Sequence, residues 1–158
     1  MRSVLTLIAL LLICMSAFGA TPQETEMSQV EAAAHMAHEN YVTAINSNNL
    51  EAVMEMLTDD VVFMAANNPV MEGKAVIKPW VEGYLNAFTT HWVKTVDEFV
   101  ITGEYAFERY SYKSTDTSKA DGSVIEDTGW GLLIYHYDAD GKWRVARDAW
   151  GPDHPASN

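Results

Sequence analysis

The chain has 158 residues, of which 48% are hydrophobic and 20% are charged, and its formal net charge is −12 at pH 7. This length suits a single domain whose hydrophobic core is large enough to contain a cavity. Because nucleic acids and anionic lipids repel an acidic chain, we expect neither to be a partner.

The first twenty residues have the pattern of a secretory signal peptide. Arg2 precedes the apolar run VLTLIALLLICM, and Ala17 and Gly19 stand where a signal peptidase could cleave. The run is short for a membrane span, and no second apolar stretch of that length follows. We therefore expect residues 1–20 to be removed and the mature protein to be periplasmic or secreted, without a membrane partner. Residues 21–27 would be a lead-in, 28–153 the domain and 154–158 a tail.

Cys14 is the only cysteine. Because it lies inside the predicted signal peptide, we expect the mature chain to have no thiol for a disulfide, a metal site or nucleophilic catalysis. A lipoprotein is the less favoured alternative, since Ile13 stands where lipidation needs a small residue. The sequence contains no phosphate-binding loop, nucleotide fingerprint or zinc motif, so we expect no cofactor and no metal.

Three helices are expected in the first part of the domain. Apolar residues recur at spacings of three and four from Met27 to Ile45, which predicts an amphipathic helix. Asn48 could cap a second, short helix whose apolar stripe ends at Leu57. The segment VVFMA predicts a buried strand and ANNPVMEG a loop. KAVIKPWVEGYLNAF predicts a third helix, in which Pro79 should produce a kink.

Four long strand-like runs follow: HWVKTVDEFVIT, EYAFERYSYKST, SVIEDTGWGLLIYHY and KWRVARDAW. They predict a meander, with Gly141 of DADG taking a positive φ in the last hairpin. Gly129 and Gly131 interrupt the longest run, and we interpret them as positions where the sheet bends. The order of elements predicts an α+β fold, in which three helices pack on the concave face of a strongly curved antiparallel sheet.

Two segments, NLEAVMEMLTDDVVFMAANNPVMEGKAVIKPWV and TGWGLLIYHYDADGKWRVARDAWGPD, resemble the SnoaL-like branch of the nuclear transport factor 2-like, or ketosteroid isomerase-like, superfamily. The resemblance extends over residues 28–153 and includes the acidic pair Asp59–Asp60. It implies a cone-shaped fold with an apolar pocket, often dimerised through the sheet. Such proteins include isomerases, cyclases, dehydratases and non-catalytic association domains, so the fold leaves the activity open.

Asp148 and Tyr41 are the candidate catalytic residues. The resemblance implies that Tyr41, on the first helix, donates to a developing enolate oxygen, as in steroid isomerases. Those enzymes carry their base just after the first strand, where this chain has Ala65–Ala66 and no carboxylate. Asp148 in the last strand is the nearest counterpart of the acid or base of cyclase-like members. The alternative for Asp148 is an ion pair with an arginine such as Arg147, which would only stabilise the sheet.

Six further residues are candidates for ligand binding. Five tryptophans are many for this length, and each would bury a large apolar area in the core or around a flat ligand. His38 follows His35 at a spacing that metal ligands can use, although solvated histidines are favoured. Asp127 could face a pocket or solvent. The predicted ligand-binding residues are His38, Trp80, Trp92, Asp127, Trp130 and Trp150.

Two functions remain open from the sequence. One is an enzyme of isomerase, cyclase or dehydratase type, with Asp148 as acid or base and Tyr41 as hydrogen-bond donor. The other is a non-catalytic ligand-binding or association module that uses the same cavity. In both, the expected partner is a small apolar or aromatic molecule. We also expect a homodimer through the sheet, because an aromatic-rich outer face would otherwise be exposed.

Overall fold

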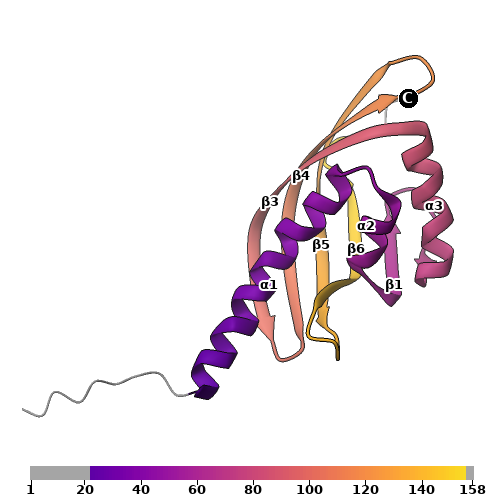
Figure 1. Cartoon of the computed structure of the whole chain (residues 1–158). Coiled ribbons are helices and arrows are strands. Elements are labelled where there is room, and N and C mark those ends of the chain that lie inside the picture. The colour runs from indigo at the N-terminus through magenta and orange to yellow at the C-terminus, as the bar shows by residue number, and fades with distance from the viewer. Residues whose placement is uncertain (1–21, 156–158) are drawn as a thin grey trace, which may run out of the picture.

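The computed structural model describes residues 22–155, so the predicted signal peptide and residues 156–158 lie outside the described residues. Three helices pack against one face of a six-stranded, strongly curved sheet (Figure 1). The predicted α+β class is therefore confirmed. Within residues 22–155, no helix has the length and hydropathy needed to cross a membrane.

Helix α1, Pro22–Asn46, lies diagonally across the concave face of the sheet (Figure 1). It begins before Met27, so most of the segment expected as a lead-in is helical. Proline suits the first turn of a helix, because the N–H that it lacks would have no partner there. The middle of the predicted apolar stripe is confirmed by the buried residues Ala34, Ala37 and Tyr41.

Helix α2, Leu50–Glu55, is capped by Asn49 and not by Asn48 as predicted. The side chain of Asn49 accepts a hydrogen bond from the backbone N–H of Ala52 at 3.1 Å. Asn48 instead has a positive φ of 53°, and its side chain binds both the N–H and the C=O of Thr90. Either asparagine could cap the helix, and the tertiary contact with Thr90 decided between them.

Six strands form the sheet in the order β2-β1-β6-β5-β4-β3. The strands β3 to β6 pair as the predicted antiparallel meander. The expectation of a wholly antiparallel sheet was wrong, because β1 pairs with β6 in parallel. Two segments so distant in the chain leave no local signal of their pairing. The bounds are β1 Leu57–Ala65, β2 Met71–Glu72, β3 Phe88–Thr102, β4 Tyr105–Ser118, β5 Val124–Tyr137 and β6 Trp143–Pro152.

Helix α3, Lys74–Ala87, confirms the third predicted helix and contains Pro79 in its interior. It buries Ile77, Val81 and Leu85, which are spaced by four and share one face. This face packs against β1 and α2, so α3 covers the β1 side of the sheet while α1 lies over β3. The kink at Pro79 stays a prediction.

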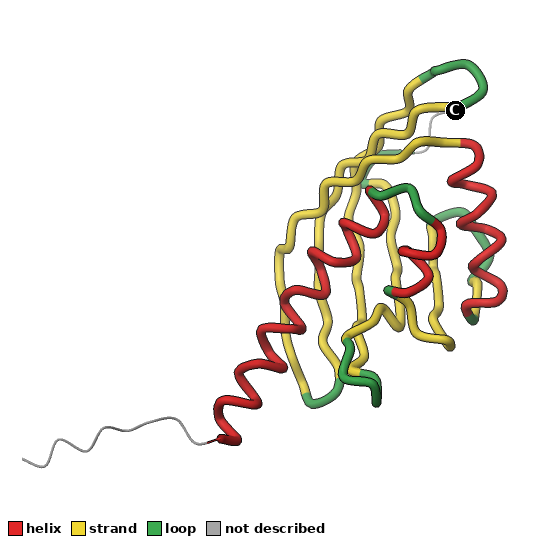
Figure 2. Tube along the Cα trace, viewed as in Figure 1, coloured by secondary structure: helices red, strands yellow, loops and turns green. Residues whose placement is uncertain are grey.

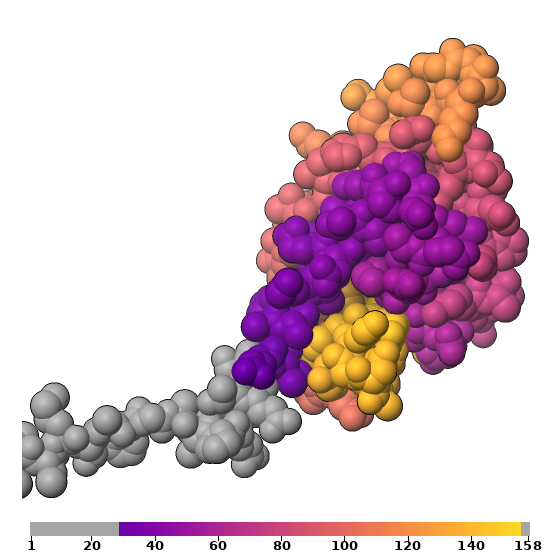
Figure 3. Space-filling view, viewed as in Figure 1, coloured from indigo at the N-terminus to yellow at the C-terminus, as the bar shows by residue number. Residues whose placement is uncertain are grey.

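The sheet curves around the helices (Figure 2), and atoms of α1 and α2 cover the middle of its concave face (Figure 3). Gly129 and Gly131 of β5 serve a purpose that the sequence did not reveal. A Cβ on Gly131 would overlap the hydroxyl end of Tyr110 and the carbonyl oxygen of Ala149, and one on Gly129 would overlap Tyr112. The two glycines therefore leave room for the tyrosines of β4 to lie flat over β5.

Candidate functional site

A cavity of about 480 Å³ opens between the helices and the concave face of the sheet. All three helices and every strand except β2 contribute to its lining. Part of the lining is aromatic: Trp80 and Tyr84 of α3 stack at 6.2 Å between ring centroids. Phe63 of β1 meets Trp150 of β6 edge-on at 5.4 Å, and Trp92 of β3 also lines the cavity. Such a surface suits a flat apolar or aromatic ligand.

Asp148 of β6 lies in the wall of this cavity and is only 3% exposed. Its Oδ2 accepts a hydrogen bond from the hydroxyl of Tyr41 at 3.0 Å, and its Oδ1 accepts one from Tyr110 at 2.9 Å. Burial raises the pKa of Asp148 above its ordinary value, although Lys94 and the two tyrosines oppose the shift. The structure therefore brings the two predicted catalytic residues into direct contact.

Tyr41 and Tyr110 are held as protonated donors. Burial and the negative charge of Asp148 raise the pKa of both hydroxyls well above the ordinary value for tyrosine. Each hydroxyl has one proton, and in both residues the hydrogen bond to Asp148 uses it. The two tyrosines thus fix both oxygens of the carboxylate.

The cation that faces Asp148 is Lys94 of β3, which the sequence prediction missed. Its Nζ lies 3.8 Å from Oδ2 of Asp148, and its side chain is 2% exposed. The Nζ also lies over the rings of Tyr41 and Tyr110, at 4.7 and 4.2 Å from their centroids. Burial lowers the pKa of Lys94, while the charge of Asp148 opposes that shift. Strand alternation places Lys94 on the same face as Trp92, but it does not tell whether that face is buried.

A second buried carboxylate, Glu108 of β4, lies beside this group and is fully buried. Its Oε1 is 2.8 Å from Nδ1 of His38, and its Oε2 accepts a hydrogen bond from the hydroxyl of Tyr135 at 2.8 Å. The charge of Glu108 acts on both Lys94 and Tyr41. The interior therefore holds two buried carboxylates, each satisfied by partners from other elements, and of the two only Asp148 lines the cavity.

Comparison with known proteins decides the family. The model of the SnoaL-like domain matches residues 38–146. The chain belongs to the SnoaL-like domain family. None of the curated proteins compared with it matches.

Several solved structures share this SnoaL-like fold. A ketosteroid isomerase-like protein from Erwinia carotovora atroseptica is 28% identical, with a TM-score of 0.71 over 78% of this chain and 96% of that chain. A protein named as a dehydratase of the nuclear transport factor 2-like family, from Streptomyces avermitilis, is 12% identical, with a TM-score of 0.70 over 81% and 99%. A protein from Xanthomonas campestris, named as a calcium/calmodulin-dependent protein kinase II association domain, is 18% identical, with a TM-score of 0.65 over 87% and 95%. Because these names differ in activity, the shared fold does not decide the function.

The six predicted ligand-binding residues of this SnoaL-like domain divide between three places. Trp80, Trp92, Trp150 and Asp127 line the cavity. His38 does not line it, because its ring binds Glu108. The placement of Trp130 in the pocket was wrong: its side chain is 62% exposed. Its neighbours Gly129 and Gly131 face the tyrosines of β4, so alternation along the strand directs Trp130 to the other side of the sheet.

Asp127 lies in the part of the cavity formed by the ends of β4 and β5. It accepts a hydrogen bond from the hydroxyl of Tyr112 at 3.0 Å, and it pairs with Nε2 of His154 at 2.7 Å. His154 also lines the cavity, although the sequence placed it in a tail. Where the steroid isomerases that this chain resembles carry their base, Ala65–Ala66 line the cavity, so no carboxylate stands at that place.

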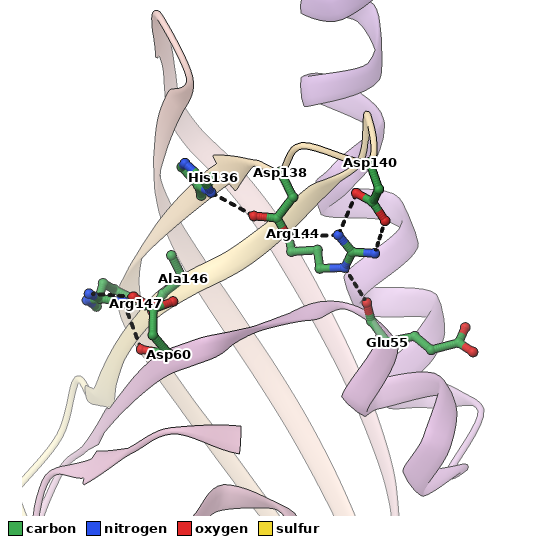
Figure 4. A network of polar contacts seen from close by, with 8 residues as sticks. All are labelled: Glu55, Asp60, His136, Asp138, Asp140, Arg144, Ala146 and Arg147. Carbon is green, nitrogen blue, oxygen red and sulfur yellow. Dashed lines mark hydrogen bonds and ion pairs between the residues drawn. The ribbon is translucent and has the colours of Figure 1, made fainter. Parts of the chain in front are cut away.

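A larger hollow of about 1340 Å³ shares no lining residue with this cavity. Its polar groups bind one another (Figure 4). Arg144 pairs with Asp138 and Asp140 at 2.7 Å each and donates to the carbonyl oxygen of Glu55 at 3.1 Å. The guanidinium of Arg147 lies 3.5 Å from the carboxylate of Asp60, so the predicted alternative, an ion pair between Arg147 and Asp148, is not formed. These contacts join β6 to β1, α2 and the last hairpin, and we assign the hollow a structural role.

Proposed function

We propose that this SnoaL-like protein is an enzyme that moves a proton on a small apolar or aromatic carbonyl compound, in a reaction of isomerase, cyclase or dehydratase type. The observation that carries the proposal is the position of Asp148. It is a buried carboxylate in the wall of an aromatic cavity, and burial raises its pKa. A raised pKa makes a carboxylate a stronger base, as proton abstraction from carbon requires.

In the proposed reaction, Asp148 takes a proton from the carbon next to the substrate carbonyl and returns it at another position. Tyr41 and Tyr110 position the carboxylate, since each donates its hydroxyl proton to one of its oxygens. Tyr41 thus acts on Asp148 and not directly on the substrate oxygen, which differs from the role implied by the resemblance to steroid isomerases. Lys94 is the only lysine or arginine among the described residues of the lining, so activation of the carbonyl falls to it.

The cavity supports a substrate of modest size. Its volume of about 480 Å³ lies within the range of about 300–1,000 Å³ usual for ligand pockets. A ligand that places its flat apolar body against Trp80 and Trp150 would direct its polar end toward Asp148 and Lys94. Exclusion of water from such a site strengthens the electrostatic interactions of Asp148 and Lys94 with a bound substrate.

Exchange of hydrogen for deuterium in β-tetralone tests the proposal. This two-ring aromatic ketone has acidic hydrogens next to its carbonyl, and proton NMR in deuterium oxide follows their loss. The wild-type protein should exchange them faster than buffer, and Asp148→Asn should reduce this rate about a hundredfold or more. Asp59→Asn is the matched control, because the Asp59 side chain is 99% exposed; it should keep the wild-type rate. Buffer-level exchange by wild type would refute the proposal.

A non-catalytic binding module is the second candidate. It is favoured by the fact that both oxygens of Asp148 already accept hydrogen bonds, as a purely structural carboxylate would. β-Naphthol, which has the shape of the enol of β-tetralone, should quench the tryptophan fluorescence of either kind of protein. Quenching without exchange would support the binding module.

We also propose that the protein is exported and forms a homodimer through its sheet. The support for the dimer is a set of apolar side chains on β3 and β5 that the single chain leaves more than one third exposed. Those on the face opposite the cavity are Val93, Val100, Val124, Trp130 and Leu132. A second copy would remove them from water.

A further inference from the structure

Lys94 differs from the surface lysines in exposure and surroundings. Its side chain is 2% exposed, whereas those of Lys74 and Lys78 are 29% and 45% exposed. Lys78 binds its carboxylate partner at 2.7 Å, but Lys94 lies 3.8 Å from Asp148, which is beyond hydrogen-bond distance. The amine of Lys94 therefore lies beside a carboxyl group in the cavity wall without a direct bond to it.

Burial acts on both members of this pair in the direction of the neutral form. Burial lowers the pKa of Lys94 and raises that of Asp148, so both shifts favour an amine beside a carboxylic acid. The rings of Tyr41 and Tyr110 attract a cation and oppose this effect. The charges of Asp148 and Glu108 also act against the fall in the pKa of Lys94, and burial outweighs these charges. An unprotonated lysine in an apolar site is a nucleophile toward carbonyl carbon.

We propose that Lys94 forms an imine with the carbonyl group of an aldehyde or ketone bound in the cavity, with Asp148 as the acid and base of that step. The inference deepens the proposed function and rests on it, since it names how the carbonyl is activated. Its geometric support is that Nζ of Lys94 and the carboxyl group of Asp148 lie 3.8 Å apart and both residues line the same aromatic cavity.

The chemistry balances without a further reagent. The nitrogen of Lys94 attacks the carbonyl carbon, and its proton moves to the oxygen by way of Asp148, which leaves a carbinolamine. The carboxyl group of Asp148 then gives its proton to the hydroxyl group, which departs as water, and the nitrogen lone pair forms the C=N bond. The product is an iminium beside the carboxylate of Asp148, and addition of water reverses the steps.

The iminium would also assist the proposed proton transfer. Its positive charge makes the neighbouring C–H bond more acidic than in the free ketone. Asp148, unprotonated after the loss of water, is then next to both the cation and the acidic carbon. Tyr41 and Tyr110 keep the carboxylate in place during this step. One lysine and one carboxylate would thus suffice for both steps.

Reductive trapping tests the imine without relying on turnover. The full chain is incubated at neutral pH with β-naphthaldehyde and cyanoborohydride, and the modified lysines are identified by peptide mass spectrometry. This aldehyde has no hydrogen next to its carbonyl, so the proposed proton transfer cannot consume it. We expect Lys94 to be modified faster than Lys78, because its lowered pKa leaves a larger share of its amine neutral. β-Naphthol should slow the modification of Lys94 and leave that of Lys78 unchanged.

Two variants complete the test. Lys94→Met should lose the trapped product at this site. Lys94→Arg keeps a long nitrogen-bearing side chain but cannot form an imine, so it should lose β-tetralone exchange about as severely as Asp148→Asn. Trapping confined to exposed lysines of the wild-type protein would overturn the inference. So would wild-type exchange by Lys94→Arg, which would leave the proposed acid–base function standing. Trapping at Lys94 without any exchange by wild type would support the imine and refute the proposed proton transfer.

Discussion

Replacing Tyr110 by Phe removes one of the two hydroxyl groups that hold Asp148 and leaves the other contacts of the ring. The lost hydrogen bond is 2.9 Å long and reaches Oδ1, while Tyr41 keeps its bond to Oδ2. The ring that lies 4.2 Å from Nζ of Lys94 also stays. Because the bond stabilises the charged form of Asp148 and so lowers its pKa, its removal must raise that pKa further.

The size of this effect follows from the strength of such bonds. A hydrogen bond to a charged group contributes about 1.5–3 kcal/mol, and one pKa unit corresponds to about 1.4 kcal/mol. Tyr110→Phe should therefore raise the pKa of Asp148 by about one to two units. The base is active only when unprotonated, so the acidic limb of the exchange rate should move by the same amount toward higher pH.

The pKa can be measured without a substrate, by carbon-13 NMR of protein labelled at the aspartate carboxyl groups. The signal of Asp148 is identified by its absence from Asp148→Asn. The matched control is Tyr84→Phe, because Tyr84 lines the same cavity but donates to Asp116. An unchanged Asp148 titration in Tyr110→Phe, or an equal shift in Tyr84→Phe, would refute the argument that this hydrogen bond tunes the carboxylate.

Three further outcomes are expected. Gly131→Ala should lower the free energy of unfolding in urea by about 1–3 kcal/mol, because the new Cβ would overlap Tyr110. The control Gly83→Ala lies in α3 with free space around it and should raise that free energy by about 0.5–1 kcal/mol. Equal effects of the two variants would contradict the packing argument. Intact mass of the exported protein should show an N-terminus near residues 20–21, and retention of Met1 would disprove the signal peptide. Light scattering at micromolar concentration should find a dimer that Trp130→Glu weakens, and a wild-type monomer would exclude the sheet interface.

Local patterns in the sequence determined most of the secondary structure. Helix α3 and the strands β3 to β6 follow from spacings of three and four or of two, and Gly141 takes its predicted positive φ of 79°. These features depend on neighbours within a few residues, so they can be read without the fold. Asp148 and Tyr41 were both named from the sequence as candidate residues. Their contact gives the carboxylate a partner without which its burial would cost several kcal/mol, roughly.

Only the tertiary structure decided how the site is assembled. The parallel pairing of β1 with β6 places Phe63 directly opposite Asp148, although the earlier prediction had β1 in an antiparallel sheet. Lys94 and Glu108 come from different strands, and α1 covers both with Tyr41 and His38. Alternation along a strand tells which residues share a face, but it does not tell which face a helix will cover. Lys94 therefore reads as a surface residue in the sequence, and only packing against α1 and β6 turns it into a buried amine beside a carboxyl group.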